Sequence, residues 1–210
     1  INFSFEAYYK RTSNMLMRVP ESYTVTGEGY RWKNVGVMAN KGIELSADGD
    51  VIRTKDFTWN VSANVSYNQN RLKELYNGVT EYVNSTTGLK YVVGHSVSEF
   101  FLNRYAGVNP ANGEQLWYDK DGNVTNEFRE SDKVMMGKTY DAPWMGGFGT
   151  SLRWKGLQLS AQFSWIGTRY VINNDRFFEE SGVTFGTAYN QSNRLLYDRW
   201  KNPGDITDIP

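Results

Sequence analysis

The sequence predicts an all-β fold, in which long antiparallel strands form a segment of a transmembrane β-barrel. Three observations support this fold class. Apolar and polar residues alternate over long stretches, the polar positions carry mostly neutral side chains, and short and long connections alternate between the stretches. The alternation has the period of two that a β-strand shows. A helical period of 3.6 is not sustained over a comparable length anywhere in the chain.

The clearest strand is expected at 57–75. Residues 57–68 read FTWNVSANVSYN, in which every odd position is apolar and every even position is polar and uncharged. A strand face in bulk water usually carries more charge, whereas a barrel lumen can be lined by neutral polar groups. We therefore expect the odd positions to face lipid and the even ones to line the lumen. The lumen-lining residues predicted here are Asn60, Ser62, Asn64 and Ser66.

Four further strands follow from the same alternation. They are expected at about 1–18, beginning INFSFEAYYK, at 35–53, with VGVMANKGIELSA, at 146–154, and at 157–170, beginning LQLSAQFSW. Lys41 interrupts the apolar set of the second of these stretches. In the last, we expect three polar residues to line the lumen: Gln158, Ser160 and Gln162. Patterns of roughly 9–13 residues exceed the globular average of about 5–6 residues per strand.

The connections between these strands differ sharply in length. Tight links at 53–56 and 155–156 alternate with long segments, which are expected to be extracellular loops at about 19–34, 76–145 and 171–210. Short turns at one rim and long loops at the other are typical of outer-membrane barrels. Trp and Tyr also gather near the expected strand ends, as interfacial aromatic girdles do.

Composition excludes several classes of protein. The 210 residues contain 23 Lys+Arg and 23 Asp+Glu, so no basic surface for nucleic acid is expected. The absence of Cys excludes disulfides and thiolate metal sites. No apolar run approaches the roughly 18 residues of a transmembrane helix. Because the chain begins at Ile1, we expect it to be processed or to be a piece of something longer.

The order of the motifs resembles that of SusC/RagA-type TonB-dependent outer-membrane transporters. NVGVMANKGIELSADGDVI at 34–52, followed by FTWNVSANVSYNQNRLKEL at 57–75, is similar to that family's N-x-G-x-x-x-N-x-G-x-E-L pattern and its Asn- and Ser-rich aromatic-x-W strand. The residues that carry this part of the resemblance are Asn34, Gly36, Asn40, Gly42, Glu44, Leu45, Phe57 and Trp59.

Three later segments extend the resemblance. YAGVNPANGEQLWYDKDGNVT at 105–125 is similar to a Y-x-G-V-D-P-x-T-G segment, with Asn109 in place of the usual Asp and Ala111-Asn112 in place of a residue–Thr pair. APWMGGFGTSLRWKGLQLSAQFSW at 142–165 resembles the family's P-x-x-x-G-G-F hairpin. DRWKNPGDITDIP at 198–210 resembles its W-x-x-P-G-D-x-T-x-x-P loop.

The resemblance implies a fold, a location and a function. The chain would be a C-terminal part of a plugged barrel of about 22 strands in the outer membrane of a Gram-negative bacterium. It would serve TonB-dependent uptake of oligosaccharides or peptides, together with a SusD-like surface lipoprotein. The TonB complex would act through a plug region outside this chain. No enzyme activity and no cofactor are implied, and outer-membrane lipid would surround the barrel.

Aromatic residues in the expected loops are candidates for ligand contact. Aromatic faces beside Asn, Asp and Arg suit sugar rings, through apolar stacking and hydrogen bonds. The alternative is that these side chains pack within the loops or against a partner protein. The candidate substrate-binding residues are Trp117, Tyr118, Trp144, Phe177, Phe178 and Trp200, and Tyr189 shares their setting.

One loop segment carries oxygen ligands at the spacing of a calcium loop. The residues are Asp119, Asp121, Asn123, Thr125 and Glu130. The sixth position of such a loop needs Gly, however, and here it is Val124. A polar Asp-Gly hairpin turn is the alternative. Calcium is therefore the one cofactor that the sequence leaves open.

Two other functional classes are compatible with parts of the sequence. A soluble secreted β-sandwich, such as a carbohydrate-binding module, would bury the odd face of 57–67 in its core. A glycoside hydrolase would need two inward-facing carboxylates at a defined separation. Glu179 and Glu180 do not provide them, because adjacent strand residues point to opposite faces. The single histidine, His95, is interpreted as a loop residue.

Overall fold

The computed structural model describes residues 1–84, 89–180 and 190–210. The chain divides into two compact units. The first comprises 1–100 and 137–170, and the second comprises 101–136 and 171–210. Strands make up most of the first unit, while the helices of both units are short. Among the described residues, no helix has the length and apolar character needed to cross a membrane.

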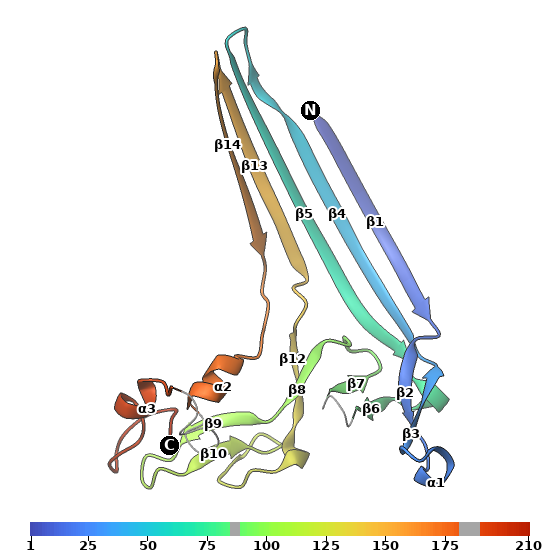
Figure 1. Cartoon of the computed structure of the whole chain (residues 1–210), viewed down its shortest axis with the longest axis vertical. Coiled ribbons are helices and arrows are strands. Elements are labelled where there is room, and N and C mark those ends of the chain that lie inside the picture. The colour runs from blue at the N-terminus through green and yellow to red at the C-terminus, as the bar shows by residue number, and fades with distance from the viewer. Residues whose placement is uncertain (85–88, 181–189) are drawn as a thin grey trace. The chain divides into compact units, whose positions relative to one another are not determined.

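A five-stranded antiparallel sheet dominates the first unit and is called the main sheet below. Its strands stand in the order β1 (Asn2–Ser13), β4 (Val37–Arg53), β5 (Phe57–Glu74), β13 (Trp144–Trp154) and β14 (Leu157–Ile166). Figure 1 shows them side by side, with the turns β4–β5 and β13–β14 at one end. The strands are 10 to 18 residues long.

The register aligns the apolar positions of all five strands on one face. Leu45 lies opposite Phe5 on one side and Val65 on the other. Val65 in turn lies opposite Gly146, which faces Trp165. Because cross-strand partners share a face, the alternation seen within each strand continues across the whole sheet.

The first strand differs from its expected range of 1–18. β1 ends at Ser13, because Asn14 adopts a left-handed backbone with φ 57° that turns the chain out of the main sheet. Residues 16–20 instead form β2 (Leu16–Pro20), which pairs with β3 (Tyr30–Asn34). The short helix α1 (Tyr23–Thr26) connects these two strands, so the segment expected as a loop at 19–34 is a capped hairpin.

The strands β13 and β14 also differ slightly from expectation. β13 begins at Trp144 rather than 146, and β14 ends at Ile166 rather than 170. The Gly167 N–H donates to the Trp144 carbonyl at 2.8 Å, which closes the pairing of the two strands.

The long connection expected at 76–145 contains ordered elements. In sequence they are η1 (Tyr76–Gly78), β6 (Glu81–Val83), β7 (Lys90–Val92), β8 (Glu99–Leu102), β9 (Arg104–Val108), β10 (Gln115–Tyr118), β11 (Val124–Thr125), η2 (Glu130–Asp132) and β12 (Val134–Thr139). β6 pairs with β7, and β8 pairs with β12. Strands of two to six residues are too short for their period to be recognised in the sequence.

The second unit contains a three-stranded sheet in the order β11–β10–β9. It also contains the helices α2 (Asn174–Glu180) and α3 (Arg194–Tyr197). Arg194 joins both helices to the C-terminal segment, donating to Glu180 at 2.8 Å and to Asp208 at 2.7 Å.

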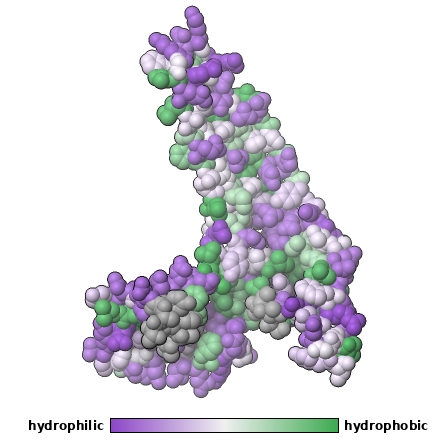
Figure 2. Space-filling view, viewed as in Figure 1, coloured by the Kyte–Doolittle hydropathy of each residue, from purple (hydrophilic) through white to green (hydrophobic). Residues whose placement is uncertain are grey.

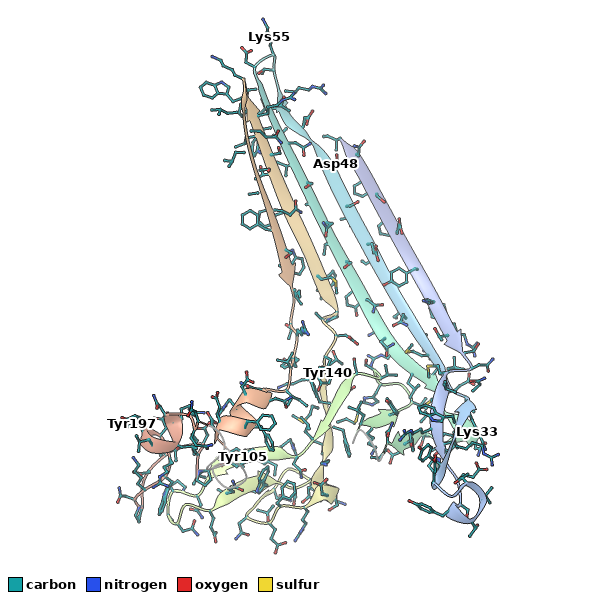
Figure 3. All side chains as sticks on the ribbon, viewed as in Figure 1. Lys33, Asp48, Lys55, Tyr105, Tyr140 and Tyr197 are labelled. Atoms are coloured by element: carbon teal, nitrogen blue, oxygen red, sulfur yellow. The ribbon has the colours of Figure 1, made fainter. Side chains whose placement is uncertain are left out.

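The buried hydrophobic residues of the first unit lie at the long-connection end of the main sheet. They are Val19, Val37, Ala39, Leu72, Leu75, Phe100 and Ala142. On the sheet itself, Phe5 and Leu159 remain 61% and 68% exposed. No second sheet among the described residues covers this apolar face, as the core of the β-sandwich alternative would require. Figure 2 shows strongly hydrophilic residues gathered at the short-turn end, where Figure 3 labels Lys55.

Candidate functional site

The polar face of the main sheet forms a continuous wall, called the polar wall below. Ser160 and Asn60 both lie opposite Ser151, while Gln162 and Ser62 both lie opposite Gly149. The register thus places all seven predicted lumen-lining residues on this one face. Their exposure to a lumen stays a prediction.

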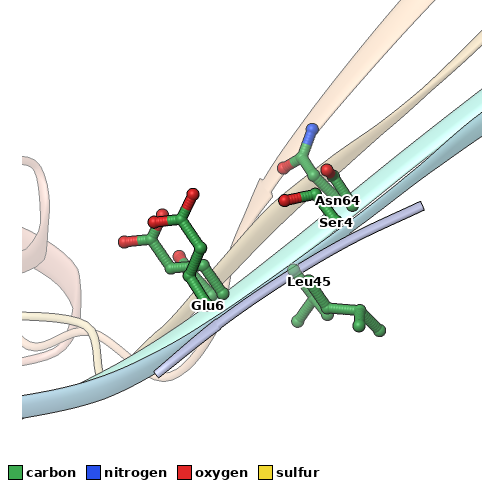
Figure 4. A pocket seen from close by; sticks show the side chains of 8 residues that line it. Ser4, Glu6, Leu45 and Asn64 are labelled. Atoms are coloured by element: carbon green, nitrogen blue, oxygen red, sulfur yellow. The ribbon is translucent and has the colours of Figure 1, made fainter. Parts of the chain in front are cut away.

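A groove of about 270 Å³ lies on the polar wall over β1, β4 and β5. Its polar lining residues are Ser4, Glu6, Glu44, Ser46, Asn64 and Ser66. Figure 4 shows Ser4, Glu6 and Asn64 on one side of the strands and Leu45 on the other. Neutral hydroxyl and amide groups of this kind both donate and accept hydrogen bonds, as sugar hydroxyls and peptide groups require.

The sequence did not predict that the two carboxylates of this groove form a pair, since Glu44 was named only as a motif residue. Glu6 and Glu44 are direct cross-strand partners in the β1–β4 register. Both occupy polar positions of the strand alternation, which was the available signal, but their pairing required the register. Two like charges in direct opposition destabilise a sheet modestly. The two paired carboxylates give this part of the wall a local negative charge.

The glycine and asparagine residues of the N-x-G motif have structural roles beside the polar wall. Tyr8 lies over Gly42, where an added Cβ would meet the tyrosine ring at 2.6 Å. The Tyr8 hydroxyl then donates to Asn68 Oδ1 at 3.1 Å. Asn40 accepts from the Asn70 amide at 2.9 Å, and Asn70 Oδ1 accepts the Val97 N–H at 3.0 Å. The motif thereby fixes three strands and a connecting segment to one another.

The apolar face has aromatic residues near both of its ends. Tyr67 and Trp144 stand 4.7 Å apart by ring centroids near the long-connection end, and Phe57 faces Trp154 at the short-turn end. Ten residue steps from Phe57 to Tyr67 cover about 34 Å along the strand at about 3.4 Å each. At the barrel tilt of about 40° this becomes about 26 Å, which matches the apolar band of about 25 Å in outer-membrane barrels.

One pair of polar groups on the apolar face is hydrogen-bonded internally. The Trp59 indole N–H donates to Thr150 Oγ1 at 2.8 Å. Gly146 is covered by Trp165, since a Cβ there would meet the indole ring at 2.8 Å. Both arrangements keep the face closed and apolar.

The predicted loop position of Trp144 is wrong. Trp144 is the first residue of β13 and projects from the apolar face beside Tyr67. The preceding APW sequence contains Pro143, whose carbonyl accepts the Asn68 N–H at 2.9 Å, so the chain already runs along β5 at this point. A role of Trp144 in substrate binding is not supported by this position.

The other loop aromatics belong to the second unit. Trp117 packs edge-to-face against Tyr105 and Phe128, at 5.1 and 4.9 Å between ring centroids. The Arg104 guanidinium lies 5.5 Å from the Tyr118 ring. Phe177 and Phe178 are exposed on α2. Tyr189 lies outside the described residues. Ligand contact by these aromatics stays a prediction.

Trp200 anchors one family-like segment on another. Its Nε1–H donates to the Pro110 carbonyl at 3.1 Å, and the Gly204 N–H donates to the same carbonyl at 2.8 Å. Gly113 lies against the Trp200 ring, where a Cβ would approach to 2.6 Å. The segments 105–125 and 198–210 thus form one packed structure, in which Asn109 Oδ1 accepts the Ala111 N–H at 3.0 Å.

The segment considered for calcium is a hairpin turn. Asp119 Oδ1 accepts the N–H groups of Asp121 and Asn123 at 2.9 and 2.8 Å, and Asp119 Oδ2 accepts the Asn123 amide at 3.1 Å. These hydrogen bonds hold the pKa of Asp119 below its ordinary value, because they favour the ionised form. In the described part of the chain, no three His, Asp or Glu side chains converge as metal ligands. Calcium binding here stays a prediction.

His95 ties a connecting segment together. Its Nδ1 lies 3.0 Å from Glu99 Oε2, while Glu99 Oε1 accepts the Gly137 N–H at 2.8 Å. Glu99 is only 5% exposed, and both of its oxygens have partners, as a buried carboxylate requires. This is a structural role rather than a catalytic one.

An aromatic pocket of about 320 Å³ on the β2–β3 and β6–β7 hairpins was missed by the sequence analysis. Trp32, Tyr82 and Tyr91 line it, and the Arg18 guanidinium stands 5.1 Å from the Trp32 ring. Burial raises the pKa of the Tyr82 phenol above its ordinary value. The available signal was the aromatic alternation in YRWKN at 30–34. The contact between this segment and the residues Tyr82 and Tyr91 depends on tertiary structure.

Comparisons with known proteins agree with this geometry. A family model described as "TonB dependent receptor-like, beta-barrel" matches residues 1–204. TonB-dependent receptor SusC of Bacteroides thetaiotaomicron is 26% identical over 210 residues, covering 91% of this chain and 20% of that protein. TonB-dependent receptor P3 of Formosa agariphila is 25% identical over 232 residues, covering 100% and 22% respectively.

A solved structure shows the same arrangement of strands. The structure of the RagAB peptide transporter superposes with a TM-score of 0.86 and 34% identity, over 99% of this chain and 24% of that one. The same importer in its "closed-closed" state gives a TM-score of 0.86 with 34% identity. The chain thus spans about a fifth to a quarter of the length of the relatives that it matches.

Proposed function

We propose that this chain, which belongs to the TonB-dependent receptor-like β-barrel family, forms part of the wall of a SusC-type nutrient importer in a Gram-negative outer membrane. The family is one of transporters rather than enzymes, and its members are outer-membrane proteins. The chain supplies the barrel strands and the connecting segments at one rim.

The continuous apolar face of the main sheet carries this proposal. It runs over five strands and covers about 26 Å of membrane depth at the usual barrel tilt. A contiguous exposed apolar surface of this extent is unfavourable in water but suits lipid. The polar wall then faces the lumen, where its hydroxyl, amide and carboxylate groups meet water, the plug or the cargo.

The mechanism of import that we propose is the one that the likeness to SusC and RagAB supports. A SusD-like lipoprotein would cover the long connections as a lid, and the two proteins would enclose an oligosaccharide or a peptide. The TonB complex would then pull on the plug of the whole transporter and release the cargo inward. The residues of this chain form no covalent bond with the cargo in this process. They hold the wall rigid and present polar and aromatic groups.

The aromatic pocket is the part of this chain that we propose for cargo contact. Trp32, Tyr82 and Tyr91 offer ring faces, and Asn84 and Arg18 add polar groups at its border. Sugar rings stack on such faces, and aromatic peptide side chains do the same. RagAB is named a peptide transporter, so both cargo classes stand as outcomes of the test.

The test uses the whole transporter, co-expressed with the SusD-like lipoprotein proposed as its lid. Cells carrying it are supplied with labelled oligosaccharide and oligopeptide mixtures, and the internalised label is identified by mass spectrometry. We expect uptake of one cargo class and its loss in a strain without TonB. Trp32→Ala with Tyr82→Ala should reduce that uptake, while Tyr197→Ala, an exposed aromatic in the second unit, should not.

Two results would overturn the proposal. TonB-independent uptake, or none of either class, would contradict import by this mechanism. The soluble β-sandwich alternative has its own test: a whole protein that stays compact in solution without detergent would contradict the barrel.

A further inference from the structure

The apolar face changes its character just beyond the Tyr67–Trp144 row. The next row across the sheet reads Tyr9–Lys41–Gln69, and the row after it reads Arg11–Ala39–Arg71. Lys73 follows on β5. Cations thus replace hydrocarbon side chains on the same face, at the end of the sheet that leads into the long connections.

These side chains surround a groove of about 350 Å³, called the cationic groove below. Tyr9, Lys41, Gln69, Arg71 and Lys73 line it. Lys41 and Arg71 are diagonal cross-strand neighbours, and such positions lie about 7–8 Å apart. The three cations therefore share one small space on the surface.

Within the residues that the structure describes, the three cations that line the groove have no acidic partner. Arg11 pairs with Glu74 at 3.1 Å, but no described carboxylate lies within ion-pair distance of Lys41, Arg71 or Lys73. Counting Arg11, the cluster holds four cations against the one carboxylate of Glu74, a formal excess of three positive charges. Like charges at this spacing repel one another, so an anion in the groove lowers the energy of the cluster.

We propose that the cationic groove binds the phosphorylated headgroup of a lipid in the outer leaflet of the outer membrane. The groove borders the apolar face, so a molecule with an anionic head and acyl chains fits both surfaces at once. Arg71 suits a phosphate because its planar guanidinium donates two parallel hydrogen bonds. The Tyr9 hydroxyl and the Gln69 amide can bond to sugar hydroxyls of a glycolipid head.

The depth of the groove favours a lipid over a free anion. Its first row lies two residues beyond Tyr67, at the level where interfacial aromatics give way to lipid headgroups. A charge at this level costs far less than one at the middle of the bilayer. The inference rests on the proposed orientation, in which the apolar face meets lipid and the long connections lie outside the cell.

The experiment measures lipid binding to the whole transporter in detergent by native mass spectrometry. The probes are a monophosphorylated lipid A and the same lipid without phosphate. Wild type should prefer the phosphorylated form by about tenfold or more, since each Lys or Arg near a lipid surface strengthens binding to anionic headgroups. The variant Lys41→Gln/Arg71→Gln/Lys73→Gln should lose that preference.

A matched control removes three cations from the short-turn rim. Arg53→Gln/Lys55→Gln/Lys155→Gln should keep the preference within about twofold of wild type, because these residues lie at the opposite end of the sheet. Equal binding of both lipids by wild type, or an unchanged preference in the groove variant, would overturn the proposal. Displacement of the lipid by millimolar inorganic phosphate would assign the groove to a free anion and overturn it too.

Two further measurements cover misfolding and the link to import. If the groove variant does not fold, lipid binding to wild type is measured at rising salt concentration instead. Salt should weaken binding of the phosphorylated lipid and leave binding of the phosphate-free lipid unchanged. A lipid preference that does not depend on salt contradicts the proposal. Equal binding of both lipids by a wild-type transporter whose TonB-dependent uptake is intact would reject the groove and leave the proposed function standing. An exchange of the two faces, with the polar wall in lipid, is tested at the end of the Discussion and would reject both.

Discussion

At the scale of single residues, the main sheet depends on a few paired exceptions to its alternation. Thr150 is the polar residue in the Val61–Thr150–Ala161 row of the apolar face, and its hydroxyl oxygen accepts the Trp59 indole N–H. Gly146 leaves space that Trp165 fills. In lipid the Trp59 N–H could not turn to water, so it needs the Thr150 hydroxyl as its acceptor.

Replacing Thr150 by Val should leave the Trp59 N–H without an acceptor on a lipid-facing surface. We expect a loss of about 1–3 kcal/mol in the free energy of unfolding, the usual cost of an unsatisfied buried donor. Thr150→Ser keeps the hydroxyl and should lie close to wild type. Denaturant unfolding of the whole transporter in lipid vesicles measures both. Equal stability of the two variants would show that the hydrogen bond contributes nothing.

Replacing Gly42 by Ala should disrupt the pairing of β1, β4 and β5. The new Cβ would stand 2.3 Å from the Tyr67 carbonyl oxygen and 2.6 Å from the Tyr8 ring, and the backbone atom cannot move aside. We expect a lower yield of folded barrel, measured by heat-modifiable mobility on electrophoresis.

Gly156→Ala is the matched control for Gly42. No atom lies within 4 Å of an added Cβ at Gly156 in the β13–β14 turn, so folding should be nearly unchanged. If Gly42→Ala folded as well as Gly156→Ala, the close approach of Tyr8 and Tyr67 would not be required.

Part of this residue-scale detail was accessible from the sequence. A glycine pair such as Gly146-Gly147 in a strand indicates close packing or a bend, and the packing of Trp165 over Gly146 shows close packing at that position. The positions of Trp117 and Trp200 were not accessible, because either residue could face a ligand or pack within its own segment. Only tertiary contacts such as the Trp200–Pro110 hydrogen bond decide between these alternatives.

At the scale of elements, the long strands were predictable and the short ones were not. The alternation at 57–75 repeats often enough to define β5 within one residue at its C-terminal end. β1 ends early, at Ser13, and the left-handed conformation of the following Asn14 has no unique signature in the sequence. The β2–β3 and β6–β7 hairpins pair locally through strands of three to five residues. The aromatic pocket depends on contacts between these two hairpins, which lie far apart in the sequence.

A charge introduced into β5 should destabilise the transporter much more on the apolar face than on the polar wall. Val61→Arg places a cation near the middle of the apolar face, where we expect a cost of about 2–4 kcal/mol. Ser62→Arg places the same cation on the polar wall and should be far milder. Unfolding of the whole transporter in vesicles of defined lipid compares the two. Equal damage from both substitutions would refute the assignment of the faces.

Acid should loosen the ion-paired segment of the second unit. Hydrogen bonds from Arg176 and Arg194 hold the pKa of Glu180 below its ordinary 4.5, and those from Arg194 and Arg176 hold that of Asp208 below its ordinary 3.8. For a depressed pKa, the stabilisation is present above the ordinary value and is lost as the pH falls through the lowered one.

Hydrogen exchange tests this pH dependence. Amides of α2 and α3 should exchange faster, after correction for intrinsic rates, when the pH falls from 6 to 3. Arg194→Gln removes the donor shared by both carboxylates and should make exchange fast already at pH 6. Unchanged protection at pH 3 in wild type would contradict a stabilising role of the network.

At the scale of the whole molecule, the main sheet is one sector of a larger barrel. β1 and β14 each have one edge without a strand partner in the described chain, and such edges are not tolerated in lipid. The chain covers 20–24% of the relatives' length, so other strands of the whole transporter are expected to pair with these edges. The fold class was predictable because the alternation is local, whereas the cargo depends on surfaces that this sector only partly supplies.

The orientation of β5 is tested most directly by nitroxide labels at positions 60 to 66 of the whole transporter in lipid vesicles. This chain contains no Cys, so single cysteines can be introduced into it one at a time once any Cys elsewhere in the transporter has been replaced. Accessibility to oxygen, which concentrates in lipid, should peak at 61, 63 and 65 and fall at 60, 62, 64 and 66. Peaks at the even positions, or no alternation, would contradict a barrel wall with its apolar face in lipid.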